Sequence, residues 1–91
     1  MSISLKIPTP LRRMTNGEST ATVEGSNISE CINSLDSLHP GIKDRLVGEN
    51  GELHRFVNVY VNGEDIRFQE GIKTSVSSGD EISIVPAVAG G

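Results

Sequence analysis

The chain contains few side chains with reactive chemistry, and the first candidate is its one cysteine. Cys31 has no second cysteine with which to form an internal disulfide. A catalytic thiolate needs exposure and an electropositive environment, whereas Cys31 lies on an apolar stripe with Ile32 and Leu35. We therefore expect Cys31 to be a core residue and not a nucleophile. An unpaired thiol fits a reducing compartment, and we expect a cytoplasmic location.

Histidines, carboxylates and glycines are too scattered to define a catalytic site. His39 and His54 are fifteen residues apart and lie in no Cys-rich or Glu-x-x-His spacing, so no metal site is expected. The adjacent carboxylates of Glu64–Asp65 and Asp80–Glu81 would point to opposite faces of a strand. Gly48-x-x-Gly51 lacks the Lys-Ser/Thr pair of a phosphate loop. We predict that the chain is not an enzyme.

The C-terminal end is the one segment with a distinctive chemistry. Pro86 is followed by Ala87, Val88, Ala89, Gly90 and Gly91. Glycine has no Cβ, so the last two residues fit a channel too narrow for any side chain and leave the terminal carboxylate unhindered. Five extended residues span at most about 17 Å, which lets the Gly91 carboxylate reach a partner's active site. We predict a carrier protein whose partner supplies the catalysis.

Length and composition limit the body that carries this tail. Ninety-one residues are enough for one small core without disulfides but not for two. Ile and Val together number 17, against six Leu and three Ala, which favours strands. The net charge of −4 and the absence of any basic run longer than Arg12-Arg13 argue against nucleic-acid binding. The sequence has neither a leader peptide nor an apolar span long enough to cross a membrane, so we expect neither secretion nor membrane insertion.

Hydrophobic periodicity in the first half predicts two strands and a helix. Alternation from Ser2 to Ile7 predicts a strand, and Asn16-Gly17 predicts the turn into a return strand over Glu18–Val23. From Ile28 to Leu38, apolar residues at helical spacing predict one buried helical stripe. Asn27 precedes this stripe and Glu30 stands three residues on, which is the spacing of a capping pair.

The second half is predicted to hold further strands. Alternation from Phe56 to Val61 predicts a strand, and Asn62-Gly63 predicts a turn into a strand over Glu64–Phe68. A last strand is predicted over Ile82–Pro86. We therefore predict an α+β fold: one domain over residues 1–86, with a mixed sheet of four to five strands and one main helix packed across it, then an extended, flexible tail over residues 87–91.

Four blocks of sequence resemble a known family. They are Ile7-Pro8-Thr9, Leu53 to Asn62, Glu64 to Phe68, and the ending Pro86 to Gly91. Through them the chain resembles, over nearly its whole length, the ubiquitin-like β-grasp sulfur carriers of the MoaD/ThiS superfamily, which serve molybdopterin, thiamin and cysteine biosynthesis. Within that family it is most similar to the carriers of cysteine biosynthesis.

The resemblance implies a cycle at the C-terminal carboxylate. An ATP-dependent activating enzyme would adenylate Gly91, and sulfur would replace AMP to give a thiocarboxylate. A PLP-dependent cysteine synthase would then accept the sulfur, and a zinc metallopeptidase would release the cysteine. ATP, PLP and zinc are thus expected on partner enzymes, with no cofactor on this chain. Some relatives are made with residues after the Gly pair, and the resemblance implies that this chain needs no such processing.

A surface for these partners is expected on the outer face of the predicted sheet. Phe56 and Tyr60 alternate with the core positions of their strand, and one helix covers only one face of a sheet. We predict that Phe56, Tyr60, Arg67 and Val85 contact the partner enzymes.

Other functions stay open on the same sequence. The chain can be a molybdopterin synthase small subunit or a thiamin-type carrier, because both use the same thiocarboxylate. It can also be a ubiquitin-like modifier attached to lysines of other proteins, since an acyl adenylate does not dictate its nucleophile. The remaining alternative is a binding domain with an unused tail. The sulfur donor and the oligomeric state do not follow from the sequence.

Overall fold

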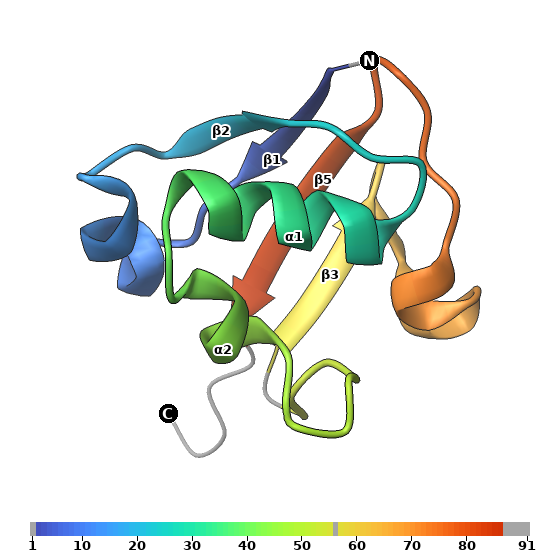
Figure 1. The fold of residues 1–91 in the computed structure, drawn as a ribbon. Coiled ribbons are helices and arrows are strands. Elements are labelled where there is room, and N and C mark those ends of the chain that lie inside the picture. The colour runs from blue at the N-terminus through green and yellow to red at the C-terminus, as the bar shows by residue number, and fades with distance from the viewer. Residues whose placement is uncertain (1, 56, 87–91) are drawn as a thin grey trace.

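A computed structural model describes residues 2–55 and 57–86 of the chain, and these form a five-stranded mixed sheet with helices on one face (Figure 1). The strands are β1 (Ile3–Lys6), β2 (Thr20–Val23), β3 (Val57–Val61), β4 (Glu64–Asp65) and β5 (Glu81–Pro86). Their order across the sheet is β2-β1-β5-β3-β4. β5 is parallel to β1, and every other neighbouring pair is antiparallel. The predicted α+β layout is confirmed.

Two α-helices and three short 3₁₀ helices connect the strands. They are α1 (Ile28–Leu38), α2 (Ile42–Leu46), η1 (Thr9–Thr15), η2 (Ile66–Phe68) and η3 (Gly71–Lys73). Figure 1 shows α1 lying across the face of the sheet, with α2 beside its C-terminal end. The predicted main helix is therefore present, and a second, shorter helix follows it.

The core lies between the sheet and α1. Alternation along β1, β3 and β5 directs one set of side chains toward the helix, and the stripe on α1 meets them. The fully or nearly fully buried members are Ile3, Leu5, Val57, Val59, Ile82 and Ile84 from the sheet, and Ile28, Cys31, Ile32 and Leu35 from α1. The other set of strand side chains points to the opposite face, which we call the open face.

The N-terminus of α1 is capped almost as the sequence predicts. The side chain of Asn27 accepts a hydrogen bond from the backbone N–H of Glu30 at 2.8 Å. The Glu30 carboxylate reaches back one residue further than expected, accepting from the N–H of Ser26 at 2.9 Å and from its hydroxyl at 3.0 Å. These bonds lower the pKa of the Glu30 carboxyl. Both side chains thus satisfy amides at the start of the helix.

The antiparallel pairing of β1 with β2 confirms the predicted return strand, and the connection between them contains η1, which ends at Asn16 with a φ of 57°. Two predictions were wrong in detail. The strand predicted over Glu64–Phe68 stops at Asp65, because the Asp65 carboxylate accepts from the N–H of Arg67 at 2.8 Å and starts η2. Leu38 lies at the edge of the α1 stripe and is 55% exposed.

The Asn27 cap makes a testable contribution to stability. Asn27→Ala removes the acceptor for the Glu30 amide, and we expect the free energy of unfolding to fall by about 1 kcal/mol, measured by urea denaturation. Asn33→Ala, at an exposed interior position of α1, is the matched control and should leave stability unchanged or slightly raised, because alanine favours helix. Equal losses in both variants would contradict a capping role.

Candidate functional site

The tail predicted to carry the chemistry starts where β5 ends. Ala87, Val88, Ala89, Gly90 and Gly91 lie outside the described residues, so the structure bears on the point from which they leave. Pro86 is the last residue of β5 and pairs with Val57, and Val85 pairs with Asn58. We call these four residues the tail root.

The tail root lies at the end of an interior strand and is held by β3. β5 has β1 on one side and β3 on the other, but β1 pairs only with residues 81–83. Among the described residues, Val85 and Pro86 therefore pair with β3 alone. Pro86 has no N–H to donate, which suits the end of a strand. The N–H of Val57 donates to the carbonyl of His54 at 3.0 Å, and the N–H of His54 donates to the carbonyl of Leu46 in α2 at 3.0 Å.

The open face brings two of the predicted partner residues together. The register places Thr20, Lys6, Ser83, Tyr60 and Asp65 side by side across all five strands. Tyr60 is half-buried, and Val85, its diagonal neighbour on β5, is 43% exposed. Phe56 lies outside the described residues. Tyr60 and Val85 thus form an apolar spot on a largely polar face, next to the tail root.

Arg67, the fourth predicted partner residue, is bonded within the chain. Its Nη1 donates to the side-chain oxygen of Asn58, and its Nη2 donates to the carbonyl of Val57 at 2.8 Å. The same Nη2 is 3.2 Å from the carbonyl oxygens of His54 and Arg55. The guanidinium therefore lies against the β3 side of the tail root.

Sequence reasoning missed Asn58 as the partner of Arg67, although a signal for it exists. The turn at Asn62-Gly63 pairs Val61 with Glu64 and Tyr60 with Asp65. Continuing that register two steps further places Asn58 opposite Arg67. It also missed Phe68, whose side chain is 89% exposed on η2, because the predicted strand would have placed it on the same face as buried Ile66.

Two other residues considered in the sequence, Cys31 and Asp80, have structural roles. Cys31 is fully buried, and burial, with a smaller contribution from the charge of Glu30, raises the pKa of its thiol to about 11. Hydrogen bonds from Ser77 and Asn62 lower the pKa of Asp80 at its turn. Within residues 2–55 and 57–86, no three His, Cys, Asp or Glu side chains gather as a metal site would require.

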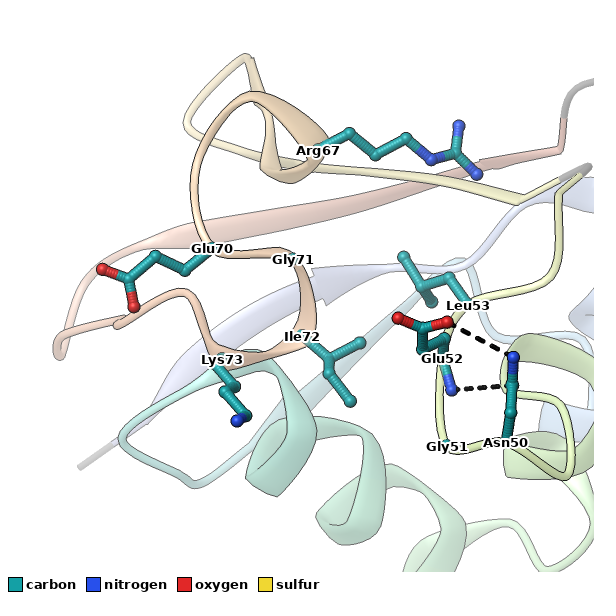
Figure 2. Close-up of a pocket in the computed structure, with 9 residues that line it drawn as sticks. All are labelled: Asn50, Gly51, Glu52, Leu53, Arg67, Glu70, Gly71, Ile72 and Lys73. Atoms are coloured by element: carbon teal, nitrogen blue, oxygen red, sulfur yellow. Dashed lines mark hydrogen bonds between the residues drawn. The ribbon is translucent and has the colours of Figure 1, made fainter.

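A surface cavity of about 570 Å³ lies between residues 50–53 and the η2–η3 segment (Figure 2). Its charged groups are of both signs: Glu52, Glu70, Arg67 and Lys73. In Figure 2 the side chains of Arg67 and Glu70 extend in opposite directions, and Glu52 is hydrogen-bonded to Asn50. The groups do not converge on a common point, so the cavity defines no ligand.

A mixed sheet with its last strand in the centre and one helix packed across it is the β-grasp fold of ubiquitin-like proteins. The sequence model of the ThiS family matches residues 5–91, and the chain belongs to this family. The sulfur carrier protein CysO of Mycobacterium tuberculosis is 43% identical over 93 residues, a match that covers 100% of both chains. These findings confirm the expected family.

Solved structures agree with this assignment. In the crystal structure of the Amycolatopsis orientalis BexX/CysO complex, the matching chain is 49% identical with a TM-score of 0.93, over 98% of this chain and 99% of that one. The crystal structure of SAMP1 from Haloferax volcanii matches with 28% identity and a TM-score of 0.82 over 100% of both chains. These relatives are small ubiquitin-like carriers and not enzymes, which confirms the predicted class. None of the helices in the described part of the chain is long and apolar enough to span a membrane.

The environment of Cys31 predicts an unreactive thiol. With a pKa of about 11, only about one molecule in a thousand is thiolate at about pH 8, and the side chain is shielded from solvent. We expect a thiol reagent such as Ellman's reagent to label the native chain far more slowly than the urea-unfolded chain. Labelling of the native chain at the rate of free cysteine would contradict a core role.

Proposed function

We propose that the chain is a sulfur carrier for cysteine biosynthesis, whose Gly91 carboxylate is adenylated by a partner enzyme and converted into a thiocarboxylate. The observation that carries this proposal is the 43% identity with the sulfur carrier protein CysO over the full length of both chains. The small-residue ending after Pro86 provides the reactive group and its reach.

The first part of the cycle replaces one oxygen of the Gly91 carboxylate by sulfur. A carboxylate oxygen of Gly91 attacks the α-phosphate of ATP on the activating enzyme, and pyrophosphate leaves. Sulfide sulfur then attacks the acyl carbon, and AMP leaves with the former carboxylate oxygen. The product is a thiocarboxylate, in which one oxygen of the C-terminus has been replaced by sulfur. Adenylation is required because a carboxylate is otherwise too poor an electrophile.

The later steps also belong to partners. A PLP-dependent cysteine synthase supplies an aminoacrylate, the thiocarboxylate sulfur adds to its terminal carbon, and an S-to-N acyl shift leaves cysteine in amide linkage to Gly91. A zinc metallopeptidase hydrolyses that amide and regenerates the carboxylate. ATP, PLP and zinc are therefore bound by the partners, and the cycle takes place in the cytoplasm.

The chain itself contributes position and access. The tail root fixes the start of the tail by pairing the end of β5 with the first two residues of β3. Five extended residues carry the carboxylate up to about 17 Å from Pro86, so a partner can enclose the reacting carbon while the folded body stays outside its active site. No side chain of the carrier is needed for the bond changes.

A second function, protein modification, is favoured by a different observation. The match with SAMP1 of Haloferax volcanii covers both chains fully at 28% identity, and two related proteins of that organism are small archaeal modifier proteins 1 and 3. The same acyl adenylate forms an amide when a lysine amine attacks it. Isopeptide-linked Gly91 on other proteins, found by mass spectrometry of digests, would distinguish this outcome from sulfur transfer.

The carrier proposal is tested at Gly91. After incubation with ATP, sulfide and the activating enzyme, the intact mass should rise by the exchange of one oxygen for one sulfur. Deletion of Gly91 should abolish that shift and leave the melting temperature unchanged, because the residue lies beyond β5. The absence of any adenylate or thiocarboxylate on the wild-type chain would falsify the proposal.

We also propose that Tyr60 and Val85, with Phe56, contact the activating enzyme. Their apolar spot lies next to the tail root, so an enzyme that encloses the tail also covers them. The guanidinium of Arg67 is engaged within the chain, so Tyr60 and Val85 carry this proposal among the described residues.

Charge placed in this spot should weaken docking. Val85→Asp is expected to raise the KM of the activating enzyme for the carrier about tenfold, equivalent to about 1.4 kcal/mol, because an unpaired carboxylate would be buried in the complex. Thr22→Asp, on the open face of β2 away from the tail root, is the control and should leave KM unchanged. An equal KM for both variants and the wild type would place the docking surface elsewhere.

A further inference from the structure

Among the described residues, no strand lies beside Val57 and Asn58 on the side of β3 that faces away from β5. β4 is two residues long and pairs only with Tyr60 and Val61. The first part of β3, from Val57 to Val59, therefore has no strand beside it on that side. Backbone groups of a strand that face such a gap need another partner.

Arg67 fills part of this gap. Nη2 donates to the carbonyl of Val57 at 2.8 Å, where a longer β4 would have supplied a backbone N–H. Nη1 donates to the side-chain oxygen of Asn58, the next residue on β3. The planar guanidinium thus bonds two consecutive residues of β3 at once, which a single ammonium group does not reproduce.

These two residues are the ones that pair with the end of β5. Val57 pairs with Pro86, and Asn58 pairs with Val85. The Nη2 group also lies 3.2 Å from the carbonyls of His54 and Arg55, so the segment entering β3 is held by the same guanidinium.

We infer that Arg67 is a positioning residue: by fixing Val57 and Asn58 it sets the position and direction in which the tail leaves the sheet. The inference rests on the proposed function, because it concerns delivery of the Gly91 carboxylate to the activating enzyme. The sequence suggested a partner contact for Arg67, whereas the structure assigns its donors to the chain's own backbone and to Asn58. Arg67 acts through the tail root and does not touch the reacting atoms.

A positioning role and a docking role affect different kinetic constants. Misplacement of a reacting group lowers the rate of the bound complex, so Arg67→Ala should reduce kcat for thiocarboxylate formation by about tenfold or more. KM for the carrier should change by less than about twofold, since the docking spot on the open face is retained. Arg67→Lys keeps the charge but not the planar pair of donors, and it should stay close to Arg67→Ala.

Amide hydrogen exchange gives a readout that does not depend on activity. In Arg67→Ala the amides of Asn58 and Val85 should exchange faster relative to Leu5 in the middle of the sheet. Arg13→Ala, which removes an exposed arginine of η1, is the matched control and should alter neither exchange nor kinetics. If Arg67→Ala fails to fold, Asn58→Ala removes the Nη1 acceptor from the other side and should shift kcat and exchange in the same direction.

The possible outcomes distinguish failure of the positioning role from failure of the proposed carrier function. A lower kcat with steady KM and locally faster exchange supports the positioning role. A raised KM with unchanged kcat makes Arg67 a docking residue and overturns the positioning role. Wild-type kinetics and wild-type hydrogen exchange in Arg67→Lys or in Arg67→Ala overturn it as well. If the wild-type chain forms no thiocarboxylate, the proposed function itself fails, whatever the variants do.

Discussion

The pairing of β5 between β1 and β3 is the constraint on which the rest of this structure depends. It joins the first described strand to the last one in parallel, closes the core beneath α1, and ends at Pro86. β5 has a neighbour on both sides over residues 81–83, and its end at Val85 and Pro86 is held by β3. Every functional argument about the C-terminal residues rests on that placement.

The chemistry and the stability of this chain are located in different places. Groups that elsewhere serve catalysis are used here for folding: the thiol of Cys31 is packed in the core, the Glu30 carboxylate caps a helix, and Asp80 holds a turn. The open face is mainly polar, and the apolar exception lies beside the tail root. The use of these described side chains for folding fits the proposed carrier role, in which a partner enzyme carries out the bond changes.

Local patterns predicted most of the elements, and contacts across the chain account for the rest. Alternation and the i, i+3, i+4 stripe found the main strands and α1, because each is encoded within a few residues. The end of β4 depends on whether Asp65 bonds the amide of Arg67 or continues the strand, and periodicity does not distinguish these. The same holds for Arg67. Its residue type suggested a contact with a partner enzyme, whereas its side chain donates to oxygen atoms of residues nine to thirteen positions earlier in the sequence.

The parallel pairing of β1 with β5 also governs when the molecule can fold. Ser4 pairs with Glu81, so the central contact joins residues 77 positions apart. Contacts of such long sequence separation slow folding, since a large loop must close before they form. On the ribosome the sheet therefore stays incomplete until its final strand has emerged, and a chain cut short loses its central strand together with the tail. Chains truncated before β5 would thus be open, aggregation-prone fragments.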